Sequence, residues 1–325
     1  MQQAMKYIYE VYRERSFSRA AQNLYVSQPC LSAMVKKTEE ELGAPIFDRS
    51  TSPIRLTEFG EQYIAYLEQL QELDEDLLRR LADLNGLKKG SLALGANNVY
   101  SSFVVPQAIS RFHRRYPGVQ VQLFEGNIAH LEEGLAKGTL DLVIDNCPME
   151  KSSYQKRIIG SEQLLLAVCL RSSAQRRALP PGRLQHQDIL AGRHLSAQTP
   201  ALDLSAFSEA DFIALRQGND TRIRMDALCR EAGFSPRIRL EVDQLATAYN
   251  IVCSDIGSTL VSDTLVAKTP PFANVFYYKL ASPQATRFSY FYRKRTIYVT
   301  HAMRRFMDIF ISEMQQALPG RLPAD

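Results

Sequence analysis

The chain has 325 residues, of which 45% are hydrophobic and 23% are charged, and its formal net charge is +4 at pH 7. This balance is typical of a soluble globular protein with room for more than one domain, and the small positive charge is compatible with a nucleic-acid partner. No apolar run approaches the roughly 18 residues that cross a bilayer, and the first residues do not combine a basic start with an apolar stretch, so we expect neither a membrane partner nor an export signal.

Two short helices are predicted near the start of the chain. The first has apolar residues at the spacing of one helix face, at Phe17, Ala20, Ala21 and Leu24. Ser18 is its expected N-cap. The second helix is predicted to begin after the N-cap Ser27, with Pro29 in its first turn, and to end near Leu42, where Gly43 stops it.

The second helix has two different faces. The side expected to pack inward carries Leu31, Met34, Val35, Thr38 and Leu42. The opposite side carries Pro29, Ala33, Lys36 and Glu40, flanked by Ser32 and Lys37. Two short helices joined by a tight turn, the second with a small and basic free face, form a helix-turn-helix whose second helix fits the major groove of DNA.

A small hairpin is predicted after this motif. Ile54 and Leu56 alternate with Arg55 beyond a turn-rich Ser-Thr-Ser-Pro segment at 50–53. The hairpin would form a wing that places Arg49 and Arg55 against phosphates or in a narrow minor groove.

The string SFSRAAQNLYVSQPCLS at residues 16–32 resembles the signature of LysR-type transcriptional regulators, and so do EEELGAPIFDR at 39–49 and LTEFG at 56–60. The resemblance implies that Ser27, Gln28, Pro29 and Ser32 lie at the groove and that Lys36 and Lys37 reach phosphates or bases. The predicted DNA-contact set is Arg19, Ser27, Gln28, Pro29, Ser32, Ala33, Lys36, Lys37, Arg49 and Arg55.

Some positions depart from the family pattern in this segment. Ala33 and Met34 stand where the family often has a longer polar or basic side chain, so the operator sequence does not follow from the resemblance. Thr38 replaces the usual leucine. Cys30 stands where the family often has alanine, and we expect a buried small residue there and not a redox sensor. The alternative for the whole segment is a winged helix that contacts only protein.

One long helix is predicted from Glu58, capped by Thr57 and stopped at Asn85-Gly86. Its apolar residues follow steps of four and three, as in a coiled-coil seam, with Asp74 as a polar interruption. The predicted dimerisation residues are Tyr63, Leu67, Leu70, Leu77, Leu81 and Leu84. Two-fold pairing would match an imperfectly palindromic duplex, and the family commonly forms tetramers. The alternative is an amphipathic helix packed inside its own subunit.

The rest of the chain alternates short apolar runs with amphipathic segments, as βαβ units do. Strands are predicted at 91–95, 119–123 and 140–145, with helices reaching 116 and spanning 127–137. A second group has strands at 212–216 and 257–261 and helices at 219–232 and 244–252. In parallel sheets of this kind, ligands bind beyond the carboxyl ends of the strands.

This region resembles the LysR effector domain, whose fold is like that of periplasmic binding proteins. The resemblance rests on Gly95-Ala96, Arg111-Phe112, Tyr116-Pro117-Gly118-Val119, Glu125-Gly126 and the segment 138–144. It implies a small-molecule effector of unknown identity. The predicted contacts are Asn97, Asn98, Ser101, Ser102, Gln217, Gly218, Asn219 and Thr247. These polar residues could instead merely cap helices.

The positions of Asn97, Val99 and Ile128 often carry hydroxyl residues in the family, and the loss of two of these argues against a typical carboxylate effector, although backbone N–H groups could still bind one. The predicted elements together indicate an α/β architecture after an N-terminal winged helix-turn-helix. The predicted boundaries are 1–57 for the DNA-binding domain, 58–88 for the linker helix, 89–300 for the effector domain and 301–325 for a C-terminal helix and tail. Subdomain I would span about 89–162 and 268–300, and subdomain II about 163–267.

Cysteines and histidines give no sign of a metal or catalytic centre. The five cysteines form no C-x-x-C pair and are odd in number, which suits a reducing, cytoplasmic location. Cys229 and Cys253 are expected to be buried and inert. The five histidines lack zinc spacing, and no nucleophile elbow, P-loop or dinucleotide fingerprint occurs, so we expect no enzyme, metal or cofactor. A solute-binding protein and a redox sensor on the same fold are the alternatives.

Overall fold

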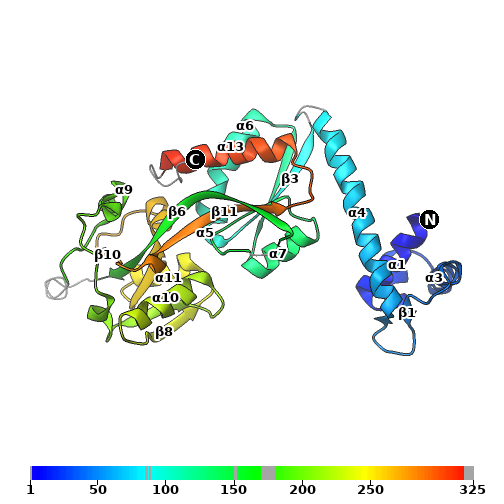
Figure 1. Cartoon of the computed structure of the whole chain (residues 1–325), viewed down its shortest axis with the longest axis horizontal. Helices are drawn as coiled ribbons and strands as arrows, with labels where there is room; N and C mark the ends of the chain where they lie inside the picture. The colour runs from blue at the N-terminus through cyan, green and yellow to red at the C-terminus, as the bar shows by residue number, and fades with distance from the viewer. Residues whose placement is uncertain (1, 85–86, 88, 150–151, 170–179, 318–325) are drawn as a thin grey trace. The chain divides into compact units, whose positions relative to one another are not determined.

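The computed structural model describes residues 2–84, 87, 89–149, 152–169 and 180–317 of the chain (Figure 1). Contacts within the chain divide it into two units, Met1–Arg80 and Leu81–Asp325.

The first unit contains the predicted helix-turn-helix and wing. Its elements are α1 (Gln2–Glu14), α2 (Phe17–Asn23), α3 (Gln28–Leu42), β1 (Phe47–Asp48), β2 (Arg55–Leu56) and the first part of α4 (Glu58–Leu84). The helix α1 is not among the elements expected from the sequence. Its Ile8 and Val11 are fully buried against α2 and α3, together with Ala20, Leu31 and Val35. This apolar cluster holds the helices at a fixed angle, since a close-packed core tolerates little displacement.

The second unit is an α/β structure. Its strands are β3 (Gly90–Ala96), β4 (Val119–Glu125), β5 (Leu142–Asp145), β6 (Tyr154–Cys169), β7 (Asp211–Leu215), β8 (Arg237–Val242), β9 (Ser258–Ser262), β10 (Val275–Lys279) and β11 (Thr286–Lys294). Its helices are α5 (Asn98–Phe103), α6 (Val105–Arg115), α7 (Ile128–Ala136), α9 (His186–Leu190), α10 (Asp220–Glu231), α11 (Leu245–Cys253), α12 (Asp263–Lys268) and α13 (His301–Ala317), with short 3₁₀ turns η1 (Arg193–Leu195), η2 (Leu204–Phe207) and η3 (Pro283–Ala285).

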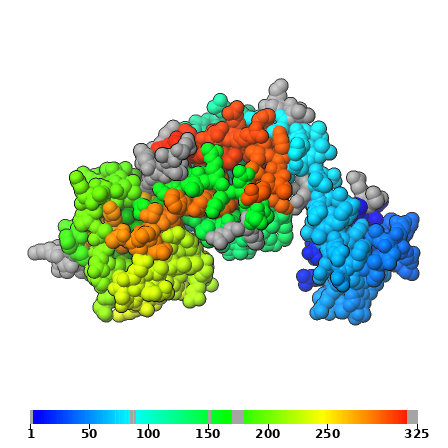
Figure 2. Space-filling view, viewed as in Figure 1, coloured from blue at the N-terminus to red at the C-terminus, as the bar shows by residue number. Residues whose placement is uncertain are grey.

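The strands of this unit follow the order β4-β3-β5-β11-β6-β9-β7-β8, with β10 also paired to β6. The strands β3, β4 and β5 are mutually parallel, as predicted, and so are β7 and β8. Two lobes result, because β6 pairs antiparallel with β11 along its first part and with β9 and β10 along its last part. Figure 2 shows the green β6 and orange β11 segments side by side on the visible face.

The chain was expected to return to the first lobe near residue 268, but it returns later, at β11. The strand β10 still pairs with the second half of β6, and only β11 pairs with β5 of the first lobe. The first lobe is covered by α6 and α13, whose Phe112, Phe306 and Phe310 pack around the buried Tyr100 and Phe291. The β6 and β11 ladder forms the backbone connection between the lobes.

Candidate nucleic-acid interface and effector cleft

The N-terminus of α2 is capped by Ser16. The backbone of Ser16 is extended, and its side chain accepts a hydrogen bond from the Arg19 N–H at 3.4 Å. The prediction of Ser18 as the cap is wrong, because Phe17 is already helical and its side chain is buried in the core. The Arg19 guanidinium donates to the Glu14 carbonyl at 2.8 Å, so part of this predicted DNA-contact residue is engaged within the unit.

The helix α3 begins and ends as predicted. Ser27 is its N-cap and accepts a hydrogen bond from the Cys30 N–H, while Gly43 ends it in a left-handed conformation with φ of 75°. The thiol-bearing Cys30 is exposed, so the expectation of a buried residue is wrong: the first turn of α3 projects beyond the core. In the preceding turn, Tyr25 is 95% exposed.

The outer side of α3 is free of core contacts. Leu31 and Val35 are fully buried on its inner side. The predicted contact residues exposed on the outer side are Gln28, Pro29, Ala33, Lys36 and Lys37. Ser32 is half-buried. The Thr38 hydroxyl donates a hydrogen bond to a main-chain carbonyl one turn earlier. The polar group of this threonine, which stands in place of the usual leucine, therefore has a partner. Leu42, expected to pack inward, is 43% exposed.

Each exposed lysine of α3 has an acidic neighbour one turn later. Lys36 Nζ lies 3.6 Å from Glu40 Oε1, and Lys37 Nζ lies 3.8 Å from Glu41 Oε1. All four side chains are mostly exposed, so the pairs contribute little to stability and can exchange partners readily.

Glu39 joins α3 to the wing. Its Oε1 accepts hydrogen bonds from the N–H groups of Ile46 and Phe47 at 2.8 and 3.1 Å. Its Oε2 accepts one from Arg49 Nη2 at 2.9 Å, and Arg49 Nη1 donates to Ser32 Oγ at 3.3 Å. Arg49, predicted to contact DNA, therefore also orients the wing on α3.

Arg55 is the exposed arginine at the wing's second strand. It lies opposite Asp48 in the two-stranded pairing of β1 and β2. The Ser50 hydroxyl and N–H donate to the Asp48 carboxylate and lower its pKa, with a smaller contribution from Arg55. Arg55 and the lysines of α3 thus supply solvent-facing cations from the wing and from the second helix of the motif.

The α4 residues predicted to form a dimerisation seam differ in exposure: some are buried within the first unit and others are exposed. Tyr63 and Leu67 are buried in the core of their own unit, as the alternative interpretation expects for these two. Leu70 is half-buried, Leu77 and Leu81 are 56% and 49% exposed, and the Leu84 side chain lies outside the described residues. Three further exposed apolar residues of α4 were not predicted: Tyr66, Leu73 and Leu78.

A cleft of about 580 Å³ lies between the two lobes of the second unit. One wall comes from the carboxyl ends of β3, β4 and β5, and the other from the ends of β7 and β8 and the starts of α10 and α11. This is the place where parallel sheets commonly bind ligands.

Five of the eight predicted effector contacts line the cleft: Asn97, Asn98, Gln217, Gly218 and Asn219. Ser101, Ser102 and Thr247 are not part of this lining. Ser101 is buried and donates to Glu125 Oε2 at 2.8 Å, while Ser102 and Thr247 are exposed elsewhere. Asn97 and Asn219 also cap α5 and α10, so each of these residues both caps a helix and lines the cleft.

Several polar residues of the cleft were not predicted from the sequence: Glu125, Asn127, Asp145, Asn146, Arg216, Asp220, Asp243, Gln244 and Arg287. Asp145 is the last residue of a predicted strand and Glu125 follows another predicted strand closely, which is a usable signal. Arg287 has no local signal, because it comes from β11, far along the chain.

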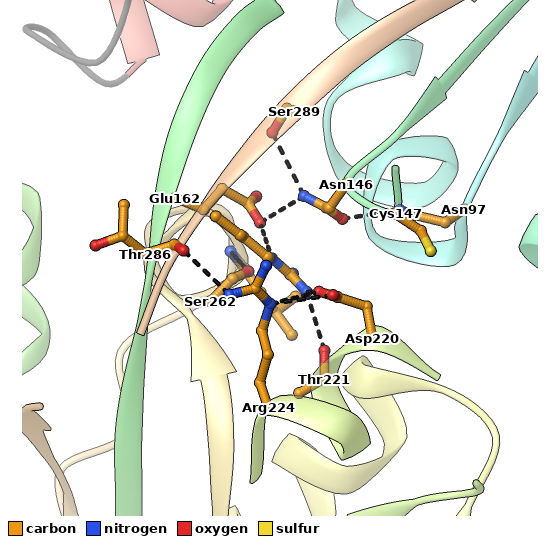
Figure 3. A network of polar contacts seen from close by, with 12 residues as sticks. Asn97, Asn146, Cys147, Glu162, Asp220, Thr221, Arg224, Ser262, Thr286 and Ser289 are labelled. Atoms are coloured by element: carbon orange, nitrogen blue, oxygen red, sulfur yellow. Dashed lines mark hydrogen bonds and ion pairs between the residues drawn. The ribbon is translucent and has the colours of Figure 1, made fainter. Parts of the chain in front are cut away.

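Asn146, Glu162, Asp220 and Thr221 belong to one network of polar contacts (Figure 3). Its centre is the buried Arg287 of β11. Its Nε donates to Glu162 Oε2 at 2.9 Å, and its Nη1 donates to Asp220 Oδ2 at 3.1 Å and to Thr221 Oγ1 at 3.0 Å. Glu162 also accepts a hydrogen bond from Asn146 Nδ2 at 2.8 Å. The network thus connects β6 and β11 with the strand end of the first lobe and the start of α10 in the second.

Asp145 is a buried carboxylate in the wall of the cleft. Removal from water raises its pKa to about 6, although it accepts a hydrogen bond from the Cys147 N–H at 2.7 Å and is attracted by Arg287. Burial likewise raises the pKa of the Cys147 thiol to about 11. The carboxylate is therefore mostly ionised at neutral pH, whereas the thiol is protonated and a poor nucleophile.

The other predicted features can be stated briefly. Burial raises the pKa of Cys229 to about 12 and that of the half-buried Cys253 to about 11. Among the described residues, no group of three or more His, Cys, Asp or Glu side chains is placed to hold a metal ion. Within the same ranges, no helix has the length and apolar character of a membrane span.

Two family profiles match the chain. The profile described as "Bacterial regulatory helix-turn-helix protein, lysR family" matches residues 2–61. The profile described as "LysR substrate binding domain" matches residues 85–196 and 189–315. Together they span both units.

Similar proteins are transcriptional regulators by name. The uncharacterized HTH-type transcriptional regulator YcgK of Bacillus subtilis (strain 168) is 29% identical over 313 residues, which cover 96% of this chain and 94% of that protein. A probable RuBisCO transcriptional regulator of Cyanidioschyzon merolae (strain NIES-3377 / 10D) is 37% identical over 261 residues, 78% of this chain and 79% of that protein.

Solved structures share the fold over nearly the whole chain. A full-length variant of OxyR from Pseudomonas aeruginosa has a TM-score of 0.66 at 21% identity, and the match covers 99% of this chain and 97% of that one. Full-length CbnR in complex with its target DNA has a TM-score of 0.60 at 18% identity, and the match covers 96% of this chain and 99% of that one.

Proposed function

Because the chain belongs to the LysR family of bacterial helix-turn-helix regulators, we propose that α3 reads an operator and that the cleft of the second unit binds the controlling small molecule. The chain is a sequence-specific DNA-binding transcriptional regulator controlled by an effector, and not an enzyme. Since it acts on promoter DNA, its proposed location is the bacterial cytoplasm.

The observation that carries the proposal for DNA is the free outer side of α3 beside the wing. The proposed contact residues are Arg19, Ser27, Gln28, Pro29, Ser32, Ala33, Lys36, Lys37, Arg49 and Arg55. Tyr25 is added because a tyrosine this exposed in the turn before α3 can bond a phosphate. Ser27 and Arg49 would combine contact with their capping and wing-orienting hydrogen bonds.

The chain works as a homo-oligomer, and we propose that α4 forms the dimer interface. Its exposed apolar residues Leu73, Leu77 and Leu81 would be covered by the same helix of a partner. Two-fold symmetry then predicts an imperfectly palindromic operator, and a dimer of dimers is the proposed larger state. The proposed domain boundaries remain 1–57, 58–88, 89–300 and 301–325.

We propose that the effector acts by changing how the two lobes close. It would contact Asn97 and Asn98 from one lobe and Gln217, Gly218 and Asn219 from the other. A ligand shifts this equilibrium only if it binds one arrangement more tightly than the other. Roles for Ser101, Ser102 and Thr247 stay predictions, since these residues lie outside the lining.

The DNA assignment is tested by Lys36→Ala and Arg55→Ala in the full-length chain. Affinity for a duplex from the protein's own upstream region is measured by fluorescence anisotropy over a range of salt concentrations. Each variant should bind several-fold more weakly, and the slope of log affinity against log salt should fall by about one per lost phosphate contact.

The matched control is Lys137→Ala, which removes an exposed lysine next to α7 that also pairs with a glutamate one turn away, Glu133. This variant should bind DNA as the wild type does. Unchanged affinity in the Lys36 and Arg55 variants would show that these residues do not contact the operator. Equal wild-type affinity for upstream and random duplex would reject operator reading by α3.

A further inference from the structure

We infer that the Arg287 side chain regulates lobe closure through an interlobe bridge that opens on one side. The bridge consists of Arg287 with Glu162 on its first-lobe side and with Asp220 and Thr221 on its second-lobe side. This inference rests on the proposed function and deepens it, because it names the contact whose opening would set the arrangement of the two lobes.

Glu162 fastens the bridge to the first lobe. It lies directly opposite Arg287 in the pairing of β6 with β11 and accepts a hydrogen bond from Arg287 Nε at 2.9 Å. Its other partners come from the first lobe: the Tyr100 hydroxyl of α5 at 3.1 Å and Asn146 Nδ2 at 2.8 Å. The Glu162 side chain is 1% exposed and is not part of the cleft lining, so this side of the bridge is closed to a ligand.

Asp220 and Thr221, the first two residues of α10, hold the bridge to the second lobe. Arg287 Nη1 donates to Asp220 Oδ2 at 3.1 Å and to Thr221 Oγ1 at 3.0 Å. Figure 3 shows Glu162 on one side of the network and Asp220 and Thr221 on the other. Unlike Glu162, these two residues line the cleft, and the Asp220 side chain is 17% exposed. The second-lobe side is therefore the side that a ligand can reach.

Opening of the bridge at Asp220 leaves both charges paired. Arg287 would keep Glu162 as its partner. Asp220 would keep Arg224, which lies one turn later in α10 and whose Nε is 3.0 Å from both carboxylate oxygens. Breaking a buried ion pair is costly when it leaves a charge without a partner, and here neither charge is left in that state. The bridge can therefore open and re-form at low cost.

The helix α5 keeps the lobes in contact when the bridge opens. Its Val99 is 5% exposed and belongs to the apolar cluster of the second lobe, together with Leu245 and Tyr249 of α11. Its Tyr100 is buried in the apolar cluster of the first lobe. Because α5 packs into both lobes, opening of the bridge would change the angle between them and would not detach them.

The bridge gives the proposed effector a point of action in the cleft. A ligand that hydrogen-bonds Asp220 or Thr221 in place of Arg287 would favour the open bridge. Such a ligand binds one arrangement of the lobes more tightly than the other, which is the condition for shifting their equilibrium.

The test is single-molecule fluorescence resonance energy transfer between the lobes of the full-length protein. Dyes are attached through click-reactive residues at two exposed positions, Ala136 of α7 in the first lobe and Arg230 of α10 in the second. Labelled chains are mixed with excess unlabelled chains, so that only distances within one chain are measured. The double variant Asp220→Asn/Thr221→Val should raise the ratio of open to closed molecules roughly tenfold, as expected for loss of a charged hydrogen bond.

The matched control is Asp226→Asn, which removes the same charge from the same helix, at a carboxylate that pairs with Arg222 outside the cleft lining. Its ratio should equal that of the wild type. Thr221→Val alone keeps every charge and should raise the ratio by a smaller factor, and this variant carries the test if the double variant does not fold. The inference is overturned if neither bridge variant changes the ratio, or if Asp226→Asn changes it as much.

A reporter fused to the protein's own upstream region tests the regulatory part of the inference. With no ligand added, output with the double bridge variant should differ several-fold from output with the wild type, because the populations of the two lobe arrangements have changed. Output with Asp226→Asn should not differ. A changed lobe ratio with an unchanged reporter would overturn the bridge as a regulator.

Binding of the wild-type protein to DNA separates this inference from the proposed function. Preference for upstream over random duplex, together with an unchanged lobe ratio in the bridge variants, rejects only the bridge. Equal binding of upstream and random duplex rejects the proposed function itself.

Discussion

At the scale of single residues, the buried carboxyl group of Asp145 lowers the stability of the folded chain when it is ionised. Its folded-state pKa of about 6 lies above the ordinary value of 3.8, because burial penalises the charged form. A carboxylate with a raised pKa favours the folded state when it is protonated, and this advantage is lost as the pH rises from about 4 to about 6. At neutral pH the cost of ionising it in the folded chain is about 2–3 kcal/mol.

We predict that Asp145→Asn raises the free energy of unfolding at pH 7.5 by about 1–2 kcal/mol. Asparagine can still accept the Cys147 N–H but carries no charge. Urea unfolding at pH 7.5 and at pH 4.5 measures the effect, and the gain should be smaller at the lower pH, where Asp145 is protonated. A variant that is less stable than the wild type at both pH values would contradict the prediction.

The residues of the cleft were predictable only where the chain signals them locally. Asn97, Asn98 and Asn219 come soon after strands and before helices, and this position alone indicates a strand-end ligand site. Glu125 and Asp145 end strands too, but whether a last side chain faces the core or the cleft depends on register. Arg287 reaches the cleft through pairing of β11 with β6, which the sequence does not encode at short range.

At the scale of elements, α4 shows what periodicity can and cannot establish. The step of four and three identified its apolar side, yet Tyr63 and Leu67 are covered by their own unit, whereas Leu77 and Leu81 are exposed. The spacing of apolar residues shows which side chains belong to the apolar face of the helix. Only the tertiary structure shows which of them are already buried within the same chain. The prediction of the long α4 helix is confirmed, as is the termination of α3 at Gly43.

We predict that Leu73→Ala with Leu77→Ala lowers the oligomeric state. Each leucine, if buried in a dimer, contributes about 2 kcal/mol, so the double variant should dissociate at concentrations where the wild type is paired. Light scattering after size exclusion measures the mass. Leu240→Ala, which trims an exposed leucine of β8, is the control and should leave the mass unchanged. An unchanged mass in the double variant would exclude this part of α4 from the interface.

At the scale of the whole molecule, the α/β architecture and the parallel strands were predictable from the alternation of apolar runs and amphipathic segments. The long strand β6 was not, because its residues serve two sheets and change partners from β11 to β9 and β10 midway. The polar link between the lobes depends on this strand. The Arg287 and Glu162 side chains are 4% and 1% exposed, so loss of one would leave the charge of the other buried.

We predict that Arg287→Met lowers the free energy of unfolding by about 3–5 kcal/mol, because Glu162 would keep a buried charge without its cation. Adding Glu162→Gln should recover a large part of the loss. Urea unfolding measures both variants. Arg237→Met, which removes an exposed arginine paired with Asp211, is the control and should change stability by less than about 1 kcal/mol. Equal losses in the single and double variants would contradict the role of an uncompensated charge.

The acidic partners of the α3 lysines have a consequence for the search along the chromosome. Glu40 and Glu41 act as built-in counterions for Lys36 and Lys37, so arrival at arbitrary duplex frees fewer bound salt ions than two bare lysines would. Under the proposed DNA contact, binding to unrelated sequence would be weaker than with two unpaired lysines. Firm contact would form only where the groove draws the lysines away from their own glutamates.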